Sequence, residues 1–143
     1  MTEKRPLTMY GVGDCAPYRE DLASSFRHVS SLFSQADLTF GQLESVLSLQ
    51  GTPSSCTRMP CSSRPEVAGV MKDAGFDVVS FGSNHALDYG REAFCETLDH
   101  LKEAGLLVTG AGKNEEEART YPVADVHGTK VAVLGYCSIL PQG

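Results

Sequence analysis

The chain has 143 residues, of which 41% are hydrophobic, so it is long and apolar enough to form one domain with a buried core. Its formal net charge is −6, it contains no tryptophan and it has no run of lysine and arginine, which argues against nucleic acid as a partner. We find no apolar signal core and no stretch near the ~20 residues of a membrane helix, so we expect a cytoplasmic chain without a membrane segment, with export of a longer parent protein left open.

The predicted elements alternate between strands and helices along the chain. Short apolar runs and alternating patterns predict strands at residues 7–13, 37–43, 76–81, 106–109, 121–126 and 130–136. Helical spacing of apolar residues predicts helices at residues 18–36, 63–74, 91–104 and 114–119. The last two strands read as a hairpin around His127 and Gly128. This order predicts an α/β fold with a mainly parallel sheet.

Ligand-type side chains follow three of the predicted strands. Asp14 follows the first and Glu44 the second, and the stretch GFDVVSFGSNHALDYG at residues 75–90 places Asn84 and His85 after the third. Functional residues gather at the carboxyl ends of such strands, and carboxylate, amide and imidazole groups all bind divalent metals. Two plainer interpretations stay open, namely Asp14 as a turn or helix-capping residue and Glu44 as a solvated carboxylate.

A long loop is predicted at residues 50–63, which are rich in Ser, Pro, Thr and Gly. Its two cysteines, Cys56 and Cys61, have no second pair and no nearby histidine to complete a zinc set. The chain has five cysteines, an odd number that favours reduced thiols over a disulfide framework. Arg58 and Arg64 would meet an anionic substrate from this region, or remain ordinary surface arginines.

A resemblance to a known family rests on motifs in a fixed order. They are Gly13-Asp14, ADLTFGQLES at residues 36–45, GFDVVSFGSNHALDYG, the turn Gly110-Ala111-Gly112, and KVAVLGY at residues 130–136. Together they resemble the CapA family of bacterial capsule or poly-γ-glutamate biosynthesis proteins, which are similar to calcineurin-like metallophosphoesterases. The resemblance implies a sandwich of sheets flanked by helices. It also implies that residues 1–143 are one domain, the N-terminal part of a CapA-like metallophosphatase domain that is incomplete at its C-terminus.

Carried over by position, the resemblance implies four metal-binding residues: Asp14, Glu44, Asn84 and His85. The metal would be Mn, Fe or Zn. This chain has Gln42 where the family's asparagine-leucine-glutamate block begins with Asn, although the carboxylate of that block is kept. His85 would bind metal or act as an acid toward the leaving oxygen. Asp88 would orient the ring of His85 or, in a plainer interpretation, cap the next helix, so His85 and Asp88 are the candidate catalytic pair.

The main functional hypothesis is a metal-dependent hydrolase of the phosphoesterase type, acting on an anionic small molecule or polymer in capsule or poly-γ-glutamate biosynthesis. A second hypothesis is a non-catalytic accessory subunit of a synthesis and export assembly, which would bind an anionic polymer or other capsule-synthesis subunits. A third is a fragment whose function belongs to a longer parent protein. Bound metal and turnover of a generic phosphoester would separate these hypotheses.

Overall fold

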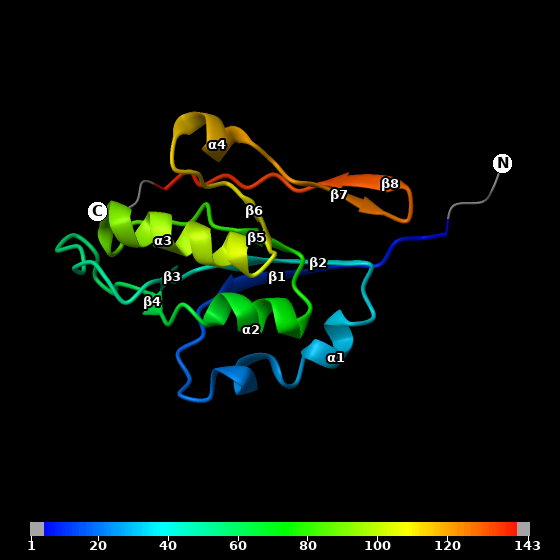
Figure 1. Ribbon diagram of the computed structural model, residues 1–143, viewed down its shortest axis with the longest axis horizontal. Helices are drawn as coiled ribbons and strands as arrows, with labels where there is room; N and C mark the ends of the chain where they lie inside the picture. Colours follow the sequence, from blue (N-terminus) through cyan, green and yellow to red (C-terminus); the bar gives the residue numbers. More distant parts are fainter. Residues whose placement is uncertain (1–4, 140–143) are drawn as a thin grey trace.

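A four-stranded parallel sheet forms the centre of the protein, in a computed structural model that describes residues 5–139 (Figure 1). The strands lie in the order β1 (Met9–Cys15), β2 (Leu38–Leu43), β5 (Val78–Ser80) and β6 (Leu107–Thr109). Their order across the sheet is their order along the chain, so successive crossovers run in one direction. Because such crossovers share one handedness, they place their helices on the same face of the sheet.

The helices of the three crossovers pack on that face, while α4 (Glu115–Arg119) lies apart from them beside the C-terminal segment (Figure 1). The three crossovers contain a 3-10 helix η1 (Leu22–Phe26) with the short α1 (Ser30–Phe33), then α2 (Val67–Ala74), then α3 (Gly90–Glu103). A small parallel pair, β3 (Val46–Leu47) and β4 (Ser62–Ser63), encloses the loop that precedes α2. After β6 comes α4, whose first turn is capped by Asn114.

A hairpin covers part of the opposite face of the sheet. It consists of β7 (Val123–Val126) and β8 (Thr129–Ala132), which pair antiparallel as predicted. The turn between them holds His127 at a φ of 51° and Gly128 at 77°, both in the left-handed region that tight hairpin turns need. Val126 of the hairpin packs with Leu38 and Val78 of the sheet in a second apolar cluster.

The single helix predicted over residues 18–36 is wrong. The segment forms η1 and α1, separated by a turn. Serine side chains bond to nearby carbonyl groups here: the Ser24 hydroxyl donates to the carbonyl of Asp21 at 2.6 Å, and that of Ser34 donates to the carbonyl of Ser31 at 3.0 Å. Such local bonds give the backbone an alternative to a continuous helix.

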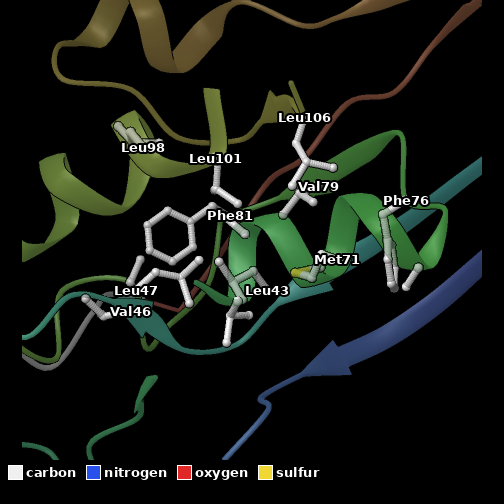
Figure 2. Packing of buried hydrophobic residues seen from close by; sticks show 14 of the residues in the cluster. Leu43, Val46, Leu47, Met71, Phe76, Val79, Phe81, Leu98, Leu101 and Leu106 are labelled. Atoms are coloured by element: carbon white, nitrogen blue, oxygen red, sulfur yellow. The ribbon is translucent and has the colours of Figure 1, made fainter. Parts of the chain in front are cut away.

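The main core lies between the sheet and the helices (Figure 2). Figure 2 shows Leu43 and Val79 from the sheet facing Met71 of α2 and Leu101 of α3. Phe76 is fully buried, and the rings of Phe26 and Phe33 meet it edge to face with centroids 5.2 and 5.0 Å away. The apolar spacing of residues 18–36 is therefore only partly matched by burial. Leu22 and Phe33 are buried and Phe26 packs against the core, but Val29 and Leu32 are 37% and 45% exposed.

Two further expectations concern the chain as a whole. The five cysteines are all free, as their odd number suggested. Within residues 5–139, none of the helices combines the length and the apolar composition that crossing a membrane requires.

Candidate functional site

The predicted site residues meet at the carboxyl edge of the sheet. Asp14 lies within β1 and not after it, because the strand is shifted from the predicted residues 7–13 to Met9–Cys15. In the strand register Asp14 is paired with Gln42, and Gln42 with Ser80. One row of polar residues therefore crosses three neighbouring strands near their carboxyl ends.

Glu44 accepts hydrogen bonds from two of its neighbours. The Gln42 amide donates to Oε2 at 2.6 Å and the Ser83 hydroxyl donates to the same oxygen at 3.3 Å. On the other side, Oε1 lies 3.4 Å from Nε2 of His85. Burial and the nearby negative charge of Asp14 raise the pKa of Glu44 above its ordinary value, while the Ser83 hydrogen bond and His85 act in the opposite direction. A cation placed here would relieve the repulsion between the two carboxylates.

His85 is held by a buried carboxylate. Its Nδ1 lies 2.6 Å from Oδ2 of Asp88, whose side chain is 1% exposed. The same carboxylate accepts a hydrogen bond from the backbone N–H of Cys61 at 2.7 Å and one from the hydroxyl of Thr57 at 3.1 Å. The cap residue of α3 is Tyr89, so Asp88 faces the ring of His85 and does not cap the helix. An acceptor on Nδ1 fixes the ring and leaves Nε2 toward Glu44.

Asp14 and Asn84 line two different hollows of the surface. Asn84 is half-buried and lines a cavity of about 270 Å³ together with His85 and Arg58. Asp14 is exposed and lines another hollow, together with Arg19. The structure thus brings Glu44, His85 and Asp88 into direct contact, while Asp14 acts on Glu44 through its charge and Asn84 shares a cavity with His85.

Sequence reasoning did not assign four contacts that support this site. Gln42 and Ser83 bind Glu44, and Thr57 and Cys61 bind Asp88. Ser83 carried a weak signal, since a hydroxyl two residues before a functional histidine often bonds to the backbone, and here Oγ accepts from the His85 N–H at 3.1 Å. The loop residues carried no signal, because only the fold brings them to Asp88.

Comparison with known proteins identifies the family. The family described as "Bacterial capsule synthesis protein PGA_cap" matches residues 5–143. The chain belongs to this family. The resemblance to CapA proteins is thereby confirmed, and so is the α/β fold with a parallel sheet flanked by helices, as a partial calcineurin-like fold.

Individual proteins also match along most of the chain. The chain is 30% identical over 152 residues to the capsule biosynthesis protein CapA of Bacillus anthracis, a match that covers 99% of the chain and 37% of the relative. It is 27% identical over 122 residues to the PGA biosynthesis protein CapA of Bacillus subtilis, which covers 84% of the chain and 32% of the relative. The uncharacterized protein y4sH of Sinorhizobium fredii is 32% identical over 137 residues, or 90% of the chain and 30% of the relative. The chain therefore spans about a third of the length of these relatives.

Proposed function

We propose that the chain carries a metal-dependent hydrolase centre of the phosphoesterase type, in a protein of capsule or poly-γ-glutamate biosynthesis. The observation that carries this proposal is the setting of His85, with Nδ1 at 2.6 Å from the buried Asp88 and Nε2 at 3.4 Å from Glu44. A histidine fixed on one ring nitrogen by a carboxylate is the usual arrangement of a metal-ligating imidazole. The biosynthetic role is extended to this chain from the names of its relatives.

The donor groups fit a divalent ion. Two carboxylates, Asp14 and Glu44, raise the negative potential at the edge of the sheet, and Asn84 and His85 add an amide oxygen and an imidazole nitrogen. A mixed oxygen and nitrogen set of this kind suits Mn, Fe or Zn. When bound, such an ion supplies Lewis-acid polarisation of a phosphoryl oxygen.

The residues of the chain would hold and move a proton at His85. Oδ2 of Asp88 already accepts a hydrogen bond from the backbone N–H of Cys61. This oxygen therefore also acts as a hydrogen-bond acceptor toward Nδ1 of His85. The proton of the neutral ring therefore lies on Nδ1, and Nε2 presents its lone pair to the site. From there Nε2 binds metal or, once protonated, donates to a leaving oxygen.

Arg58 would position the anionic substrate. It lines the cavity that Asn84 and His85 share, and no carboxylate within residues 5–139 forms an ion pair with it. A guanidinium group without a partner binds phosphate or carboxylate groups through paired N–H donors. The cavity thus combines a cation for the substrate with the candidate metal ligands.

Metal content of the purified chain tests this proposal. We expect near-stoichiometric Mn, Fe or Zn in the wild type and its loss in Asp14→Ala and in His85→Ala. His28→Ala is the matched control, because His28 is exposed and lies outside the site. A folded wild type that retains no added metal would rule out the centre in this chain. Hydrolysis of a generic phosphoester by the metal-loaded chain, lost in the same two variants, would then establish the reaction class.

A second candidate function is binding of an anionic polymer without turnover, as an accessory subunit. One observation favours it: Arg19, which lines the hollow beside Asp14, also has no ion-pair partner within residues 5–139. Arg19 and Arg58 would then flank the site and bind two charges of one polymer. Binding of a poly-carboxylate that weakens in Arg19→Ala and Arg58→Ala, without any phosphoester turnover, would support this function over hydrolysis.

A further inference from the structure

A thiol lies beside the imidazole and carboxylate of the candidate centre. Within residues 5–139, Cys61, His85 and Asp88 each offer one ligand atom, and these three atoms lie within 4.8 Å of one another. Cys61 precedes β4, while His85 and Asp88 lie between β5 and α3. The fold therefore supplies the histidine that is missing around Cys61 in the sequence.

The backbone fixes this thiol in place. The N–H of Cys61 donates to Oδ2 of the buried Asp88 at 2.7 Å, and Thr57 holds the other carboxylate oxygen at 3.1 Å. The sulfur itself makes a long contact of 3.5 Å with the carbonyl of Met59 and lies near the Tyr18 side chain. Bonds to a thiol are weak, so a metal ion would displace them readily.

We propose that Cys61, His85 and Asp88 form a second metal position, one that binds a borderline-soft divalent cation such as Zn²⁺ in preference to Mn²⁺. Thiolate, imidazole and carboxylate are the three protein ligands that zinc takes, and zinc sites with three protein ligands keep a fourth position for water. The cavity that Cys61 and His85 line provides access to that position. The other donors of the candidate centre are oxygen atoms, which suit harder ions.

The two positions share His85, so they compete. Zn²⁺ bound at the thiol would take Asp88, the carboxylate that orients the imidazole, as a ligand and would thereby inhibit the hydrolysis proposed above. The position itself requires only Cys61, His85 and Asp88. Its existence therefore does not depend on the proposed function.

Titration of the metal-free chain with Co²⁺, a spectroscopic substitute for Zn²⁺, tests the position directly. Thiolate ligation gives Co²⁺ a near-ultraviolet charge-transfer band that oxygen and nitrogen ligands do not give. We expect the band in the wild type, displaced by one equivalent of Zn²⁺. We expect Cys61→Ser to lose the band and to bind Zn²⁺ at least about tenfold more weakly, since removal of an outer-shell partner alone costs about 10–100-fold.

The controls separate this position from the other cysteines and from the oxygen-rich centre. Cys56→Ser removes an exposed cysteine of the same loop and should keep the band. Asp14→Ala should lose Mn²⁺ and keep the band. A wild type without the band, a band that persists in both Cys61→Ser and Cys61→Ala, or a band that disappears in Asp14→Ala would overturn the proposal.

Discussion

The geometry of the site depends on one buried carboxylate. Asp88 is 1% exposed, and an isolated charge at such a position is strongly unfavourable. Its partners are His85, Thr57 and the backbone of Cys61, so both carboxylate oxygens are bonded. Asp88 therefore joins the loop before β4 to the turn that carries His85.

Asp88→Asn should weaken metal binding without unfolding the chain. The amide keeps the shape of the carboxylate but loses its charge, so the oxygen that faces His85 and the N–H of Cys61 becomes a weaker acceptor, and the oxygen that accepts from Thr57 is replaced by a donor. Loss of such an outer partner costs about 10–100-fold in metal affinity. Calorimetric titration with Mn²⁺ measures the change. Asp99→Asn, which alters an exposed ion pair with Lys113, is the control and should bind Mn²⁺ as the wild type does.

Glu44→Gln should have opposite effects on the metal-free and the metal-loaded chain. Burial and Asp14 raise the pKa of Glu44, so its charge opposes folding at neutral pH and an uncharged Gln stabilises the metal-free form. Metal at about 100 times its Kd stabilises the wild type by about 2.7 kcal/mol, a gain that the variant largely loses. Thermal unfolding in chelator and in Mn²⁺ gives both values. A variant that is less stable than the wild type in chelator would contradict the electrostatic argument.

At the residue scale, sequence reasoning located the strand-end residues and offered Asp88 as the residue that orients His85, but it did not find what holds Asp88. Glu44 and His85 were placed at one sheet edge because parallel strands end together, and they lie 3.4 Å apart. The contacts of Asp88 with Thr57 and Cys61 were not predictable, because a loop without periodicity does not indicate where it will pack. The metal itself remains a prediction.

At the scale of elements, the hydrophobic pattern of the sequence predicted where strands lie better than it predicted whether a helix is continuous. β2, β5 and β6 lie within the predicted ranges because short apolar runs between glycines leave few alternatives. The prediction for segment 18–36 failed because apolar spacing does not report whether the backbone stays helical, and two of the apolar residues in that spacing, Val29 and Leu32, are exposed. Its serines bond to local carbonyl groups, and the helix is broken between η1 and α1.

Asp37 is the residue that joins three elements at the other end of the sheet. Its carboxylate accepts a hydrogen bond from the backbone N–H of Thr8 at 2.9 Å. The carboxylate also contacts the guanidinium group of Arg5, and its Oδ1 lies 2.9 Å from Nε2 of His127. The N-terminal segment, the start of β2 and the β7–β8 turn therefore meet at one side chain. The hydrogen bond from Thr8, with those of His127 and Arg5, lowers the pKa of Asp37 below its ordinary value of 3.8.

Asp37→Asn should destabilise the chain at neutral pH and have little effect in acid. Because the folded-state pKa is lowered, the stabilisation is present above pH 3.8 and is lost as the pH falls through the folded value. Urea unfolding of wild type and variant across this range gives the difference in free energy. Asp73→Asn, an exposed carboxylate on α2, is the control. If the difference in free energy of unfolding between wild type and Asp37→Asn stays constant with pH, the shape of the Asp37 side chain and not its charge holds these elements together.

At the scale of the whole molecule, the loop between β3 and β4 connects the core to the site. Its start lies against α3, since Gly51 approaches the carbonyl of Tyr89, and its end supplies Thr57 and Cys61 to Asp88. Ser54 adds a backbone hydrogen bond to the carbonyl of Asp88 at 2.7 Å. The position of His85 therefore depends on this loop through Asp88, and the loop also lines the cavity beside His85 with Arg58 and Cys61.

Gly51→Ala should consequently weaken the site from a distance. Gly51 has a φ of 87°, and a Cβ there would lie 2.1 Å from the carbonyl oxygen of Tyr89, so the loop must move. The left-handed backbone alone costs about 1–2 kcal/mol for a residue with a side chain.

Gly69→Ala is the matched control, because a Cβ at this exposed position of α2 meets nothing within 4 Å and should stabilise the helix by about 0.5–1 kcal/mol. We expect Gly51→Ala to lower both the free energy of unfolding and the affinity for Mn²⁺. We expect Gly69→Ala to raise the free energy of unfolding and to leave the affinity for Mn²⁺ unchanged. Unchanged Mn²⁺ affinity in a destabilised Gly51→Ala would mean that the loop supports the fold but not His85.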